Sequence, residues 1–322
     1  RELYLRSLTD SINVNDRKYL DKISKDNLNA VVFSLLVNDA FMSFRNYQYG
    51  EKSYTKDRGY AFEHNLNENI DNVLDRTLGD YRRPELDGLI PTMILSPTIA
   101  NDGRKLHVTS RPFSFMNIEE NADEESKIRG VDYLRMFADQ DAEELSFMSA
   151  LRMSASFPYI TPTISLPSEP RIEIMDAGIA DNFGVGDALR FLYVFRDWIN
   201  ENTSGVVMVL IRDTQPNEET YSRPIPSLID RLTYPIASVY NNLGNIQDRN
   251  NDIQLEQTKD LFNGKLQTVE FIYDTRGAKS EYIRASLSWH LTTREKESII
   301  KNIYTEANEK ALSELKALAH SE

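Results

Sequence analysis

A strand pattern that runs straight into an aspartate, a turn and a helix constrains the fold of this chain more than any other feature. Ile172 and Ile174 flank a glutamate in the alternation typical of a short strand, and Asp176 follows. Small residues continue as a turn, and 185–198 has the apolar pattern of a helix. α/β enzymes present a catalytic acid or base in this way, at the edge of a sheet. The sequence therefore predicts an α/β fold with Asp176 at a candidate site.

The same segment also has a purely structural interpretation, because Asp-x-Gly before a helix is common turn chemistry. Asp181 and Asn182 are residue types that favour helix caps and turns. We therefore expect both of them to cap the following helix or to brace the turn. Asp176 is left as the candidate for chemistry.

Strand and helix patterns alternate through 90–273, which favours one α/β layer architecture over two domains. An Asn-Asp-Gly turn signal at 101–103 separates the strand patterns 91–96 and 105–109, so a hairpin is expected there. The continuous apolar run 205–211 is typical of a parallel-sheet strand that is covered on both faces.

Both ends of the chain carry helical patterns. Apolar residues fall on one helix face within 28–41 and again within 62–74. From Thr292 onward the pattern predicts one long amphipathic helix, and Thr292 and Glu295 have the spacing of a capping box.

Composition excludes several classes of function. The net charge of −13 argues against nucleic acid and against electrostatic docking on anionic lipid, although not against apolar contact with a membrane. The chain has no cysteine, and its four histidines lack the spacing of a zinc motif, so no metal site is expected. The longest apolar run, 30–37, is shorter than the roughly 20 residues that span a bilayer.

Three segments, in this order, resemble patatin-like phospholipases: the strand and turn of 93–105, Ser154-Ala155-Ser156-Phe157-Pro158, and 175–184. These are acyl hydrolases that work with a serine–aspartate pair. The resemblance implies a three-layer fold over 1–322 as a single domain, with a mostly parallel central sheet, helices on both faces and a long C-terminal helix. It also implies that Asp176 is the catalytic aspartate, that the substrate is a lipid or another acyl ester, and that no metal or organic cofactor takes part.

The nucleophile of that family has no counterpart here, because G-x-S-x-G does not occur in the 322 residues. The family's elbow serine opens a helix, and 1–8 resembles the continuation of such a helix. We therefore expect the N-terminal strand, the oxyanion loop and the elbow to lie upstream of Arg1. Ser154 and Ser156 lie on a packing segment in the resemblance and are not expected to replace the elbow serine.

It follows that this chain alone is expected to be inactive, as part of a serine-dependent lipid ester hydrolase. One departure concerns the turn, where the family has Asp-Gly-Gly or Asp-Gly-Ala and this chain has Ala177. If that position needs a positive φ, alanine would be strained by roughly 1 kcal/mol.

Two other functions stay open. The fold could serve as a catalytically inactive module that binds lipid or a protein partner, which the departure at Ala177 and the absent nucleophile both fit. The C-terminal helix could instead mediate self-association, although the sequence predicts no oligomeric state. The compartment is not predicted either: the chain as given is expected to be soluble, and attachment of a longer parent protein to a membrane stays open.

Overall fold

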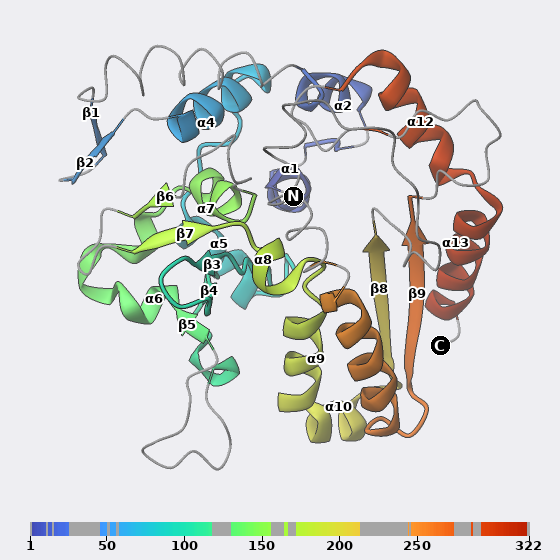
Figure 1. Ribbon diagram of the computed structural model, residues 1–322. Helices are drawn as coiled ribbons and strands as arrows, with labels where there is room; N and C mark the ends of the chain where they lie inside the picture. Colours follow the sequence, from blue (N-terminus) through green and yellow to red (C-terminus); the bar gives the residue numbers. More distant parts are fainter. Residues whose placement is uncertain are drawn as a thin grey trace, which may run out of the picture. The chain divides into compact units, whose positions relative to one another are not determined.

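The computed structural model describes residues 2–10, 12–14, 16–25, 46–49, 52–55, 58–117, 130–155, 164–166, 172–212, 244, 246–273, 285 and 291–320 (Figure 1). It divides into two compact units, which are treated separately. The first comprises Arg1–Ala180 with Ser288–His290, and the second comprises Asp181–Leu287 with Leu291–Glu322. The expected helix at 28–41 lies outside the described residues.

The first unit combines short helices with a small sheet. Its helices are α1 (Glu2–Thr9), α2 (Arg17–Ile23), α4 (Arg58–Asn69), α5 (Leu78–Leu86), α6 (Tyr133–Met136), α7 (Phe147–Met153) and the start of α8 (Gly178–Asp181), with 3-10 turns at η2 (Ser114–Met116), η3 (Ala138–Gln140) and η4 (Ala142–Glu144). A separate hairpin pairs β1 (Asn46–Tyr49) with β2 (Lys52–Thr55).

The helix expected within 62–74 ends earlier than its apolar pattern suggests. α4 stops at Asn69, and the next turn places Asp71 and Asn72 at positive φ. Ile70 and Leu74 are nevertheless buried, in a cluster with Leu3 and Met148. The apolar spacing therefore reports burial correctly, although the backbone leaves the helix in the middle of it.

The sheet of the first unit has five strands in the order β5-β4-β3-β7-β6. Their bounds are Thr98–Ile99 (β3), Lys105–His107 (β4), Gly130–Asp132 (β5), Ile164–Ser165 (β6) and Glu173–Met175 (β7). Only β4 and β5 pair in parallel, and the other three neighbouring pairs are antiparallel. The α/β class is confirmed, but the expected mostly parallel sheet is mixed.

The β3–β4 hairpin explains one of these antiparallel pairs, because a connection this short cannot join parallel strands. Gly103 turns the chain at φ 76°, as the Asn-Asp-Gly signal predicts. The first strand of the hairpin begins later than the pattern over 91–96 suggests. In that range the ladder has one isolated bridge, which joins Leu95 to Val108.

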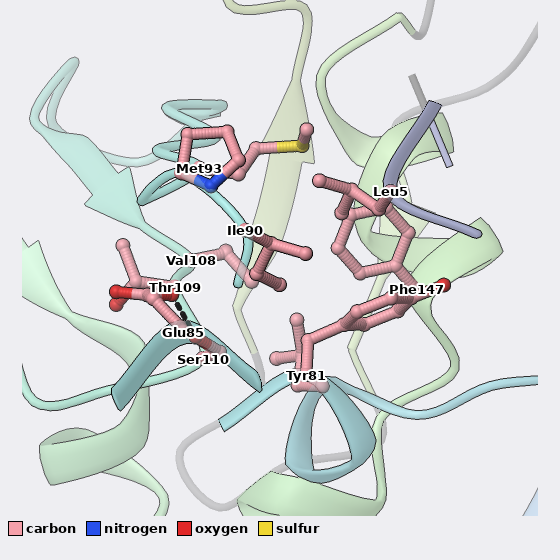
Figure 2. Close-up of a pocket in the computed structure, with 11 residues that line it drawn as sticks. Leu5, Tyr81, Glu85, Ile90, Met93, Val108, Thr109, Ser110 and Phe147 are labelled. Carbon is pink, nitrogen blue, oxygen red and sulfur yellow. Dashed lines mark hydrogen bonds between the residues drawn. The ribbon is translucent and has the colours of Figure 1, made fainter. Parts of the chain in front are cut away.

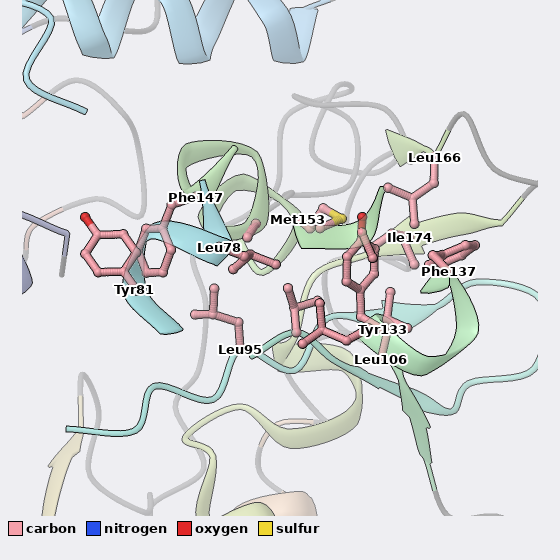
Figure 3. Packing of buried hydrophobic residues seen from close by; sticks show 14 of the residues in the cluster. Leu78, Tyr81, Leu95, Leu106, Tyr133, Phe137, Phe147, Met153, Leu166 and Ile174 are labelled. Carbon is pink, nitrogen blue, oxygen red and sulfur yellow. The ribbon is translucent and has the colours of Figure 1, made fainter. Parts of the chain in front are cut away.

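The main core of the first unit packs α5, α6 and α7 against the sheet. Near Leu5 this core borders a small pocket (Figure 2). Leu106 of β4 and Ile174 of β7 are both 0% exposed and lie within the same cluster as Phe137 and Met153 (Figure 3). The strand that leads to Asp176 is thus anchored by a completely buried side chain.

The second unit is built on two strands and several helices. They are α9 (Val185–Val194), α10 (Arg196–Asn202), β8 (Val206–Arg212), the helical residues 246–260, β9 (Leu266–Ile272), α12 (Thr293–Ile303) and α13 (Glu306–Ala319). Figure 1 shows α9 and α10 on one side of the strand pair and α13 on the other. The helix expected over 185–198 is interrupted at Phe195, which closes α9 and precedes α10.

β8 and β9 pair in parallel over their full length, from Val206↔Leu266 to Arg212↔Ile272. Met208 and Leu210 of β8 pack into a cluster with residues of α9 and α10. α13 packs against β9, and the β8 side chains on the opposite face are exposed in the described part of the chain: Val207, Val209 and Ile211 are 41%, 42% and 75% exposed. Parallel pairing is confirmed, whereas cover on both faces of this strand is not found there.

The C-terminal region contains two helices where one long helix was expected. The capping box of Thr292 and Glu295 is confirmed at the start of α12. The chain becomes extended at Thr305, with φ −70° and ψ 151°, before α13 begins. The Asn308 side chain lies in the first turns of α13, just after the break. Its Oδ1 accepts from the Ile272 N–H and its Nδ2 donates to the Ile272 carbonyl, both at 2.9 Å, which ties α13 to β9.

Candidate active site

Asp176 lies at the end of a strand, as predicted. It follows β7, and its half-buried carboxylate accepts a hydrogen bond from the Gly178 N–H at 2.7 Å through Oδ1. Gly178 is the first residue of α8, so the Asp176 carboxylate accepts from the first main-chain N–H of that helix. This contact restricts the rotamer of the side chain. A strand-end carboxylate held by a backbone donor is a suitable arrangement for a base that must meet a substrate group in one orientation.

The main chain at Asp176 is also held. The Thr98 hydroxyl of β3 donates to the Asp176 carbonyl at 2.9 Å, and the Ile179 N–H donates to the same oxygen at 3.3 Å. On the other side of the turn, the Ala177 N–H donates to the Ser154 carbonyl at the end of α7, at 3.4 Å. Sequence reasoning missed Thr98, because the pairing of β3 with β7 that places it there is a long-range contact.

The departure at Ala177 causes no backbone strain. The described non-glycine residues with positive φ are Asp71, Asn72, Asp141 and Asn263, and Ala177 is not among them. The condition under which alanine would cost roughly 1 kcal/mol is therefore not met. A Cβ atom is compatible with this turn, and the aim of Asp176 does not depend on glycine at the next position.

The rest of the turn segment has a structural role, as expected for Asp181 and Asn182. The buried Asp181 carboxylate accepts from the Asp187 N–H at 3.1 Å, within the first turn of α9. The Asn182 N–H donates to Gln247 Oε1 at 3.2 Å. Gly184 has φ 70° at the N-cap, in the left-handed region that favours glycine. The Asp181 contact confirms that its side chain caps α9, whereas Asn182 braces the turn through its main-chain N–H and not through its side chain.

Of the two serines expected upstream of Asp176, Ser154 lies within the described residues and Ser156 does not. Ser154 closes α7, and its Oγ is buried with no hydrogen-bond partner among the described residues. It contacts the Asp176 turn through its carbonyl, as described above. Ser156 lies outside the described residues. Nothing in the geometry of Ser154 pairs its hydroxyl with a carboxylate.

A different serine, Ser110, donates to a carboxylate in the pocket of the first unit (Figure 2). Glu85 accepts there from Ser110 through Oε2 and from the Thr92 hydroxyl at 2.8 Å through Oε1, and Arg111 Nε lies 3.0 Å from Oε1. Ile90 and other apolar side chains line this small pocket. The Glu85 carboxylate is thus engaged by Ser110, Thr92 and Arg111 within the first unit.

A second buried carboxylate lies beside the same pocket. Glu2 of α1 is 1% exposed, and its Oε1 accepts from the Tyr81 hydroxyl at 3.0 Å. Burial raises the pKa of Glu2 to about 7, against the smaller opposing effects of the Tyr81 hydrogen bond and of Arg6. Burial and the neighbouring Glu2 also raise the pKa of Tyr81. The Glu2 carboxyl therefore titrates near neutral pH. Asp176 is not among the residues that line this pocket.

Other candidates from the sequence do not form a site in the described residues. Within these ranges, no group of three or more His, Cys, Asp or Glu side chains could hold a metal ion. No helix in the described part of the chain is both long enough and apolar enough to cross a membrane.

Comparison with known proteins gives one match. The family model described as patatin-like phospholipase matches residues 9–189, a range that contains the Ser154 segment, β7, Asp176 and the start of α9. Searches of curated proteins and of solved structures found no match.

Proposed function

The chain belongs to the patatin-like phospholipase family, and from that premise we propose that it is the body of a lipid acyl hydrolase in which Asp176 is the general base. The family acts on lipid substrates, which makes a lipid ester the expected substrate class. The observation that carries the proposal is the position of Asp176, at the end of β7 within the matched range, with its carboxylate oriented by the Gly178 N–H at 2.7 Å.

In the proposed reaction the ionised Asp176 carboxylate accepts the proton of a serine hydroxyl while the serine oxygen attacks the ester carbonyl carbon. The tetrahedral intermediate collapses to an acyl-enzyme, and the alcohol leaves with the proton. Water then attacks the acyl-enzyme, loses a proton to the same carboxylate, and releases the fatty acid and the free serine. A base that is fixed by a backbone donor suits both proton transfers, because each requires the same oxygen in the same place.

We place the serine outside these 322 residues, since G-x-S-x-G does not occur in them. Ser154 does not fill the role, because its hydroxyl has no partner among the described residues and its contact with the turn is made by its carbonyl. The chain as given should therefore have no serine-dependent esterase activity. The missing motif also supports the second candidate, an inactive family member that binds lipid or a protein partner.

The test compares the 322-residue chain with a longer product of its gene that contains a G-x-S-x-G segment. Hydrolysis of a p-nitrophenyl acyl ester and labelling by a fluorophosphonate are measured for both. We expect activity and labelling only in the longer protein, and a loss of turnover of at least about 100-fold in Asp176→Asn. Asp197→Asn is the matched control, because its side chain is 80% exposed and it should retain activity.

Three results would count against the proposal. Activity of the 322-residue chain that a fluorophosphonate blocks would place the nucleophile within it. An Asp176→Asn variant of the longer protein with undiminished turnover would remove Asp176 from the reaction. A gene whose product contains no elbow serine would favour the binding module.

A further inference from the structure

Two hydrogen bonds hold Asp176. The Gly178 N–H donates to its carboxylate, and a buried hydroxyl donates to its carbonyl. Thr98 is 0% exposed, and its Oγ1 donates to the Asp176 carbonyl at 2.9 Å. β3 is aligned with β7 so that Thr98 faces Met175, the residue before Asp176. The hydroxyl therefore reaches one residue beyond its own register partner and holds the point at which the strand ends.

No backbone donor can replace this hydroxyl from the adjacent position on β3. The residue before Thr98 is Pro97, which has no N–H. The other donor to the Asp176 carbonyl is the Ile179 N–H, which belongs to the turn itself and lies at 3.3 Å. Thr98 thus ties this carbonyl to the sheet, whereas the Ile179 N–H ties it to its own turn.

The orientation of the Asp176 carbonyl is coupled to that of its carboxylate. The Asp176 carbonyl accepts from the Ile179 N–H at 3.3 Å, and this bond closes the turn that contains Gly178. Within that turn the Gly178 N–H is the donor to Asp176 Oδ1 at 2.7 Å. A contact that holds the carbonyl therefore supports the turn whose N–H group orients the carboxylate.

We propose that Thr98 is the positioning residue of this site: its hydroxyl holds the Asp176 peptide so that the Gly178 N–H keeps the carboxylate in the orientation of a base. The catalytic meaning of this role rests on the function proposed above for Asp176, but the positioning itself is measurable without turnover. Thr98 touches neither substrate nor the reacting atoms in this arrangement, and it acts only through the turn.

The chain contains a matched control. Ser154 also carries a buried hydroxyl beside the turn, but that hydroxyl has no partner among the described residues, and Ser154 meets the turn through its carbonyl. Ser154→Ala therefore removes a buried hydroxyl of the same kind without removing a contact to Asp176. Thr98→Val removes the hydroxyl at nearly constant shape, and Thr98→Ser restores it.

The experiment measures amide hydrogen exchange and the pH titration of the Gly178 amide shift by NMR, in the folded 322-residue chain. We expect Thr98→Val to speed exchange of the Gly178 N–H by about tenfold, the effect of weakening one hydrogen bond. The pH dependence of this amide shift should also differ from that of the wild type, because the Gly178 N–H bonds to the Asp176 carboxylate. Thr98→Ser and Ser154→Ala should both match the wild type, and circular dichroism checks that each variant is folded.

The longer protein then separates the two proposals. There Thr98→Val should lower kcat with little change in KM, and Thr98→Ser should recover it. Gly178 exchange and titration that are identical in Thr98→Val and wild type would overturn the positioning role, whatever the activity. Changed Gly178 behaviour in a protein that shows no Asp176-dependent turnover would support the positioning and overturn the hydrolase instead. If Thr98→Val does not fold, Thr98→Ala and Thr98→Ser are compared by the same Gly178 readout.

Discussion

The buried carboxyl of Glu2 should make the stability of this protein depend on pH in a direction opposite to that of an ordinary salt-bridged glutamate. Its pKa rises from its usual 4.5 to about 7, chiefly because of burial. A carboxyl with a raised pKa in the folded state releases its proton first in the unfolded state. The contribution of Glu2 to stability is therefore greatest below about pH 4.5 and falls as the pH rises to about 7.

The size of the effect follows from the same numbers. A rise of about 2.5 pH units, at about 1.4 kcal/mol per unit, corresponds to about 3 kcal/mol of stability lost across this range. Glu2→Gln removes the charge at constant shape. Its amide nitrogen takes the place of Oε2, which has no partner in the described residues, so the variant has a cost of its own that does not vary with pH.

The assay is urea unfolding of wild type and Glu2→Gln at about pH 4.5, 6 and 8, with the difference in unfolding free energy plotted against pH. We expect that difference to shift by about 3 kcal/mol in favour of the variant between the two ends of the range. Glu201→Gln, at an exposed position, should show no such trend. A Glu2→Gln difference that is constant with pH would refute the reasoning, because it would mean that the carboxyl titrates alike in both states.

Two further variants test the backbone around the site and the second unit. Gly184→Ala should lower the unfolding free energy by about 1 kcal/mol, because Gly184 has φ 70° at the start of α9, and a variant of undiminished stability would show that the turn can relax. Asn308→Ala should cost about 2–4 kcal/mol in the same assay, because it leaves both main-chain groups of Ile272 without their partner, whereas the exposed Ser313→Ala on the same helix should be neutral. An Asn308→Ala loss no larger than that of Ser313→Ala would contradict this account.

The local features of this fold were predictable from the sequence because they depend on neighbouring residues. The strand that ends at Asp176, the turn at 101–103 and the capping box at Thr292 each follow from the chemistry of a few consecutive positions. The family resemblance was likewise visible in local motifs, and the matched range 9–189 confirms it.

The features that the sequence did not predict depend on contacts between distant residues. The order β5-β4-β3-β7-β6 is set by which strands meet, and no periodicity in a single strand encodes it. The break before α13 is accompanied by bonds from Asn308 to Ile272, a residue of another element. The hydrogen bond from Thr98 to Asp176 also depends on a contact between distant residues, because it forms only when β3 lies beside β7.

Asn308 has a consequence for how this protein meets other chains. An exposed strand edge invites a strand from another molecule, which pairs through free N–H and C=O groups. At Ile272 both groups are already bonded to one side-chain amide, which presents a donor and an acceptor much as a neighbouring strand would. A strand that adds to β9 at this register would have to displace two bonds before it forms any. At this register the Asn308 side chain thus occupies the position on β9 that another strand would need.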